Sequence, residues 1–104
     1  MQTRITARHT ELSDGLRAHI ENSLNKLDRY YDGIYDAHVV LDGHESSTSD
    51  RKAEVKVNVY RRTLTAQDAG STYEDAVNRC VRQLRRQVLR YKGKLRSTDQ
   101  DVHK

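Results

Sequence analysis

Several residue types that usually build a core or a site are scarce in this chain of 104 residues. It has no tryptophan and no phenylalanine, so its six tyrosines supply most of the aromatic bulk. A single cysteine, Cys80, excludes an intramolecular disulfide and is typical of a reducing compartment. No segment approaches the ~20 apolar residues of a membrane span, and the N-terminus lacks the apolar run of a secretory signal. We therefore expect a soluble, cytoplasmic protein without membrane contact.

The sequence also lacks the usual signatures of catalysis and of metal binding. Its five histidines have no metal-ligand spacing, and it contains no glycine-rich phosphate loop and no nucleophile-elbow serine. Zinc-finger spacing, the aromatic strand motif of RNA-recognition domains and a Gly-x-x-Gly clamp are missing as well. Cys80 lies on an apolar helix stripe, which predicts a buried, inert thiol. The sequence thus predicts no enzyme, no cofactor and no metal site.

The apolar periodicity predicts six elements in the order strand, helix, three strands, helix. Alternating residues predict strands at 3–8, 34–42 and 53–60, and a fourth strand after a tight reversal at Arg61 and Arg62. Residues 43–51 form a polar loop. The length suits one domain, for which we expect residues 1–96 with a short flexible tail at 97–104.

Apolar residues at steps of three and four predict two amphipathic helices. The first begins after a Ser13 N-cap and ends at Gly33. The second is capped by Thr72 and keeps its stripe for about 23 residues, or about 34 Å. The stripe residues are Leu16, Ile20, Leu24, Leu27 and Tyr31 in the first helix and Val77, Cys80, Leu84, Val88, Tyr91 and Leu95 in the second.

These elements predict an α+β fold, a β-α-β-β-β-α two-layer sandwich. Three mostly antiparallel strands and one strand brought in by a helical crossover form a four-stranded sheet with one apolar face. Both helices pack on that face. A helix pair on a sheet is also the layout of double-stranded-RNA-binding domains.

Positive charge is concentrated in the second helix. The chain has 19 Lys and Arg against 15 Asp and Glu, and residues 76–98 hold eight of the basic residues and no acidic one. Charge of one sign on one element usually faces a polyanion. With Leu84 toward the sheet, the basic residues within about 60° of the outward direction are Arg79, Arg82, Arg86 and Arg90.

The outward arginines favour a nucleic-acid partner over a plain solvated face. From residue 79 onward we expect no intrahelical carboxylate to neutralise them, and like charges one turn apart cost about 0.2–0.5 kcal/mol per pair. On the first helix, Lys26 and Arg29 suit the C-terminal end of the dipole, so capping and solubility are an alternative role for them. They join a basic surface only if the helices lie side by side. Tyr30 is predicted to pack in the core, with stacking on a base as the alternative.

The element order and three segments resemble the ribosome hibernation-promoting factors. The segments are Leu24–Tyr31, Tyr73–Val77 and Leu84–Leu95, and the similarity spans residues 2–96. The resemblance implies a domain that binds 16S rRNA of the small ribosomal subunit between head and body, in the path of messenger and transfer RNA. There it would silence translation in stationary phase or stress. Transferred by position, the RNA-binding residues are Arg79, Arg82, Arg86, Arg90, Lys92, Lys94, Lys26 and Arg29.

The chain resembles the short form of that family, which lacks a C-terminal dimerisation domain. This implies a monomer off the ribosome and a separate factor that pairs ribosomes. Two other functions stay open on the sequence alone. One is a free-standing module for structured RNA, and the other is a protein-interaction adaptor that docks its basic helix on an acidic partner.

Overall fold

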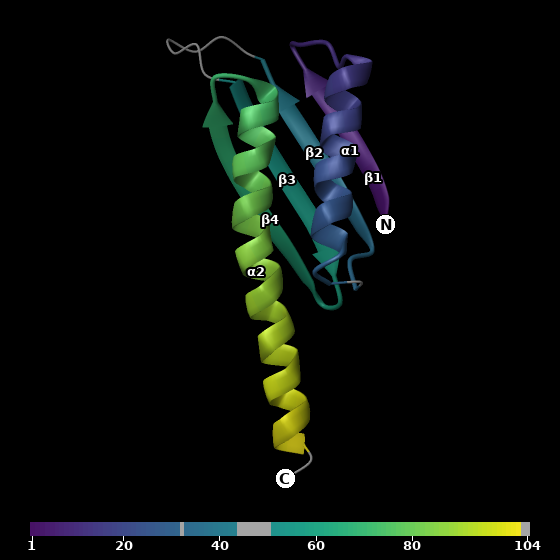
Figure 1. Cartoon of the computed structure of the whole chain (residues 1–104), viewed down its shortest axis with the longest axis vertical. Helices are drawn as coiled ribbons and strands as arrows, with labels where there is room; N and C mark the ends of the chain where they lie inside the picture. Colours follow the sequence, from purple (N-terminus) through teal and green to yellow (C-terminus); the bar gives the residue numbers. More distant parts are fainter. Residues whose placement is uncertain (32, 44–50, 103–104) are drawn as a thin grey trace.

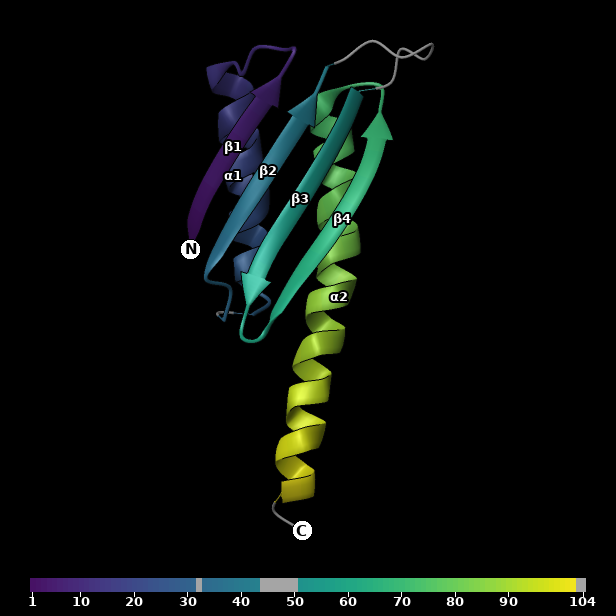
Figure 2. The same cartoon turned by 180° about the vertical axis from the view of Figure 1, so that it is seen from behind.

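The computed structural model describes residues 1–31, 33–43 and 51–102, with the backbone but not the side chains of 94–102. Its elements are β1 (Gln2–Arg8), α1 (Asp14–Asp28), β2 (Asp36–Asp42), β3 (Arg51–Val59), β4 (Arg62–Gly70) and α2 (Tyr73–Val102). β1 runs parallel to β2, the other neighbours are antiparallel, and the sheet order is β1-β2-β3-β4. Both helices cover one face of the sheet (Figure 1) and leave the other open (Figure 2). The predicted α+β sandwich is confirmed.

The core lies between the sheet and the two helices. Alternate strand residues point inward because the side-chain period of a strand is two, and one buried row crosses the sheet from Val39 to Val55 to Ala66. The apolar stripes of the two helices cover this core on the side opposite the sheet. The predicted stripe residues that are buried are Leu16, Ile20, Leu24 and Leu27 in α1 and Val77, Cys80, Leu84, Val88 and Tyr91 in α2.

The first helix begins where predicted but ends earlier. Ser13 caps it, since its hydroxyl accepts a hydrogen bond from the Leu16 N–H at 3.1 Å. The helix ends at Asp28, and the predicted end at Gly33 is wrong. The chain leaves through a tighter turn in which the Tyr30 N–H donates to the Leu27 carbonyl at 3.0 Å. The prediction failed because Tyr31 keeps the apolar spacing after the helix has ended, where it packs edge-on against Tyr91 at 5.9 Å.

The second helix is capped by Thr72, whose hydroxyl accepts from the Asp75 N–H at 3.0 Å. It continues to Val102, beyond the predicted stripe, because no proline or further glycine follows Gly93 to interrupt it. The division into a domain at 1–96 and a tail at 97–104 stays a prediction.

The remaining boundaries shift by one or two residues. β2 begins at Asp36 rather than at residue 34, and the β3–β4 reversal is centred on Tyr60 and Arg61, where Arg61 has a φ of 63°. Residues 44–50 of the predicted polar loop lie outside the described residues.

Candidate nucleic-acid interface

The outward face of α2 carries four exposed arginines, Arg79, Arg82, Arg86 and Arg90, which we call the arginine ridge. They point away from the sheet because the buried stripe on the opposite side of the helix faces it. In the part of the chain that the structure describes, no ion pair or hydrogen bond holds Arg82, Arg86 or Arg90. The predicted orientation of these three side chains is confirmed, whereas their role in RNA binding stays a prediction.

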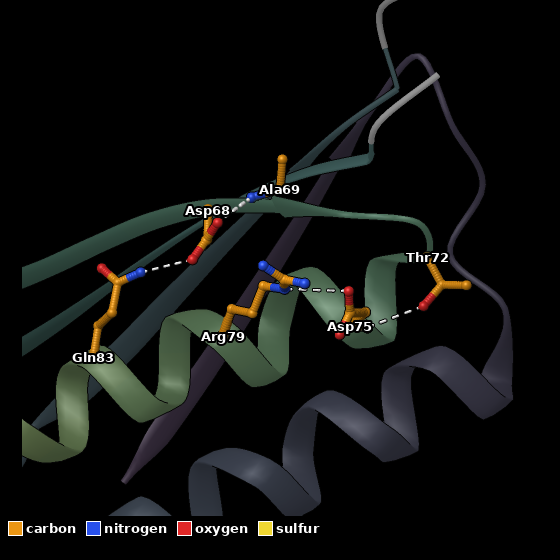
Figure 3. A network of polar contacts seen from close by, with 6 residues as sticks. All are labelled: Asp68, Ala69, Thr72, Asp75, Arg79 and Gln83. Carbon is orange, nitrogen blue, oxygen red and sulfur yellow. Dashed lines mark hydrogen bonds and ion pairs between the residues drawn. The ribbon is translucent and has the colours of Figure 1, made fainter. Parts of the chain in front are cut away.

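The first arginine of the ridge is neutralised within the protein. Arg79 Nε lies 3.2 Å from Asp75 Oδ2, one helical turn earlier (Figure 3). The expectation that no carboxylate would compensate the ridge from residue 79 onward is therefore wrong at this position. Asp75 sits in the first turn of α2, where an acidic side chain complements the helix dipole, and its spacing from Arg79 is that of a helical ion pair.

Two glutamines of α2 form hydrogen bonds with the edge strand β4. Gln83 Nε2 donates to Asp68 Oδ2 at 2.8 Å, and the other carboxylate oxygen of Asp68 accepts from the Ala69 N–H (Figure 3). One turn later, Gln87 Nε2 donates to the Thr65 carbonyl at 3.0 Å. The glutamines thus bond the Asp68 carboxylate and the Thr65 carbonyl of β4, and Arg82, Arg86 and Arg90 are not used for these contacts.

The two helices lie side by side (Figure 1) and meet at Tyr30. The guanidinium carbon of Arg85 lies 4.5 Å from the centroid of the Tyr30 ring, and Lys92 Nζ donates to the Tyr30 carbonyl at 3.5 Å. Towards the other end of the pair, His19 Nε2 and Asn78 Oδ1 are 2.8 Å apart. These contacts fix α1 against α2 at both ends of the shared interface.

This arrangement brings the C-terminal end of α1 beside α2. Lys26 is exposed in the last turn of α1, and Arg29, the C-cap that directly precedes Tyr30, is exposed as well. The helices therefore lie side by side as the prediction required, and a shared RNA-binding surface stays a prediction. Lys92 is half-buried and engaged with the Tyr30 carbonyl, while the side chain of Lys94 lies outside the described residues.

Three arginines, one in α2 and two close to it, were not among the predicted RNA-binding residues. Arg85 lies at the junction of the helices, and Arg61 and Arg62 are exposed on the β3–β4 hairpin. The guanidinium of Arg62 lies 5.8 Å over the Tyr91 ring, whose hydroxyl donates to the Tyr60 carbonyl. The hairpin thus adds basic side chains next to α2, a proximity between distant segments that periodicity does not reveal.

The single cysteine lies in the core. Cys80 is buried and its thiol donates to the Ala53 carbonyl at 3.5 Å. Burial above all, and then the negative charge of Asp68, raise the pKa of the Cys80 thiol to about 11, so the thiol is protonated at neutral pH.

The described residues provide neither a metal site nor a membrane-spanning helix. No group of three His, Cys, Asp or Glu side chains there could hold a metal ion. None of the helices in that part of the chain has the length and apolar character to span a membrane.

A sequence profile of the family described as Sigma 54 modulation protein / S30EA ribosomal protein matches residues 3–96. The chain is 29% identical over 90 residues to a ribosome hibernation promotion factor of Deinococcus radiodurans, covering 85% of this chain and 47% of that protein. It is 26% identical over 100 residues to the factor of the same name from Lactococcus lactis, covering 88% and 49%. The chain thus spans about half the length of the curated relatives it matches.

Two solved structures share the fold. The N-terminal domain of Thermus thermophilus Protein Y superposes with a TM-score of 0.78 at 29% identity, covering 88% of this chain and 99% of that one. A ribosomal subunit interface protein from Coxiella burnetii gives a TM-score of 0.80 at 20% identity, covering 89% and 99%. The second likeness concerns the fold alone.

Proposed function

Because the chain belongs to the Sigma 54 modulation protein / S30EA ribosomal protein family, we propose that it is a ribosome hibernation factor. It binds 16S rRNA of the small subunit in the messenger and transfer RNA channel and silences translation in stationary phase or stress. The action is steric occlusion in the cytoplasm, without bond chemistry or a cofactor.

One observation carries the proposal: Arg82, Arg86 and Arg90 are exposed in a row and are held by no carboxylate among the described residues. Arginine binds phosphate through planar, bidentate hydrogen bonds, and each phosphate neutralised releases counterions. A row of unpaired guanidinium groups is therefore suited to the backbone of structured RNA, which proteins recognise largely by shape and phosphates.

The fold also suits a blocking role. The buried stripe of α2 packs on a four-stranded sheet, and α1 is fixed beside it through Tyr30. An inserted element blocks a channel only if it resists displacement. The close packing of α2 on the sheet and its contacts with α1 supply that resistance here.

The test reverses the charge of the ridge. The triple variant Arg82→Glu, Arg86→Glu and Arg90→Glu should lose co-sedimentation with vacant small subunits while its melting temperature stays unchanged. The matched control places the same charge change on the open face of the sheet, at Arg4, Lys52 and Lys56, which are also exposed. That control should still bind. Retained binding of the ridge variant, or equal loss in the control, would contradict the proposal.

Further measurements separate the alternatives. Equal affinity for naked duplex RNA and for vacant small subunits would favour a free-standing RNA-binding module. Capture of an acidic protein that survives ribonuclease would favour an adaptor. The monomeric state of the free protein and the separate pairing factor stay predictions, and sedimentation velocity of the free protein tests the first.

A further inference from the structure

The junction between α1 and α2 contains a cation–π pair that phosphate binding alone does not require. The Arg85 guanidinium lies 4.5 Å from the Tyr30 ring centroid, whereas the other Arg–Tyr contacts in the described part of the chain measure 5.2–5.8 Å. Tyr30 is half-buried against the core, and Arg85 is exposed. The tyrosine therefore lies on the core side of this contact, and the arginine lies on its solvent side.

The backing ring is held in place before any ligand arrives. The Tyr30 N–H donates to the Leu27 carbonyl at 3.0 Å, and the Tyr30 carbonyl accepts from Lys92 Nζ at 3.5 Å. The ring itself packs against the core. A ring fixed in this way restricts the Arg85 guanidinium that lies over it, so less conformational entropy is lost when a base stacks on that guanidinium, which favours binding.

We propose that Arg85, backed by Tyr30, is a stacking platform for one unpaired RNA base. A planar guanidinium stacks on nucleobases, and single-stranded or bulged bases are those free to be stacked. The flanking cations supply the phosphate contacts that such a nucleotide needs, since Arg29 precedes Tyr30 in the chain and Lys92 contacts its carbonyl. The platform rests on the proposed function and gives it a preference for RNA with an unpaired base.

The platform and the ridge differ in how they use arginine. No aromatic ring backs Arg82, Arg86 or Arg90 among the described residues, so their proposed role is phosphate contact alone. Lysine preserves charge but has no plane to stack. A charge-conserving substitution of Arg85 therefore tests stacking apart from charge.

The first experiment measures the binding of Arg85→Lys to vacant small subunits at several salt concentrations. The control is Arg4→Lys, because Arg4 is exposed on β1 and lies outside the proposed interface. Loss of one stacked base should weaken binding by Arg85→Lys by about 5- to 150-fold. The salt slope should stay the same, because the charge is kept. Arg4→Lys should change the affinity by less than about threefold, because Arg4 takes no part in the proposed contacts. Equal effects of the two substitutions, with both proteins melting like the wild type, would overturn the proposal.

The second experiment does not depend on the ribosome. An RNA duplex with a single bulged 2-aminopurine is compared with the fully paired duplex of the same length. The wild type should prefer the bulged RNA by at least about fivefold and quench its fluorescence, and Arg85→Lys should remove both effects. Equal binding of the two RNAs by the wild type refutes the platform. Preference for the bulged RNA without ribosome binding would leave the platform standing and reject hibernation.

Discussion

Replacing Asp75 with asparagine should strengthen RNA binding while it weakens the fold. The Asp75 carboxylate lies 3.2 Å from Arg79 Nε and holds the first arginine of the ridge in an internal ion pair. Asparagine keeps the shape of the side chain and removes its charge. A phosphate then no longer competes with this carboxylate for Arg79, so the ridge gains one available cation.

The size of both effects follows from the geometry of the pair. One more cation that neutralises a phosphate steepens the slope of log affinity against log salt by about 0.7–0.9. If the two proteins bind equally at about 1 M salt, the variant binds about five- to eightfold more tightly at about 0.1 M. The exposed ion pair contributes about 0.3–0.5 kcal/mol and the dipole interaction about 0.3–1 kcal/mol. The melting temperature should therefore fall by about 4–8 °C, the equivalent of about 1 kcal/mol.

The assay is equilibrium binding to vacant small subunits across a salt series, together with a thermal melt. Asp14→Asn is the control, because Asp14 lies in the first turn of α1 and has no arginine partner in the described ranges. It should lower the melting temperature without steepening the salt slope. An unchanged slope or weaker binding by Asp75→Asn would refute the reasoning that the ridge acts through unpaired charge.

Three further predictions concern stability. Leu84→Ala should lower the free energy of unfolding by about 2–5 kcal/mol in a urea melt. Leu89→Ala should lower it by less than about 0.5 kcal/mol, because the Leu89 side chain is 45% exposed. Similar losses in the two variants would contradict the described core. The folded protein holds the Cys80 proton more tightly than the unfolded chain does. The stability of the wild type relative to Cys80→Ala should therefore fall as the pH rises from 9.0 to about 11. Parallel pH profiles of stability for the two proteins would disprove this. Ser13→Ala should cost about 1 kcal/mol by calorimetry and Ser13→Asp should not; equal melts would exclude a capping role.

The inward faces of the elements were predictable because backbone geometry imposes their period. In β3, Ala53, Val55 and Val57 are buried while Lys56 between them is exposed, as the alternation predicts. The outward direction of Arg82 and Arg86 follows from the same reasoning at 100° per residue. A period that repeats over several turns is informative even when single positions are not.

The ends of elements and the contacts between them were less predictable, because single interactions decide them. α1 stops at Asp28 although Tyr31 continues the apolar spacing, since a local turn competes with one more helical turn. The Arg79–Asp75 pair has the i, i+4 spacing of a helical ion pair, and it crosses the boundary between the acidic first turn of α2 and its basic remainder. The Arg85–Tyr30 contact joins residues far apart in the chain, so no local pattern could reveal it.

The two parts of α2 are subject to different constraints. Up to Tyr91, the inward side chains of α2 are buried in the core, whereas the last turns of the helix extend past the β3–β4 hairpin (Figure 1). A Cβ atom added at Gly93 would meet nothing in the protein within 4 Å. Evolution can therefore lengthen, shorten or recharge the projecting end to fit a different target without redesigning the body that carries it.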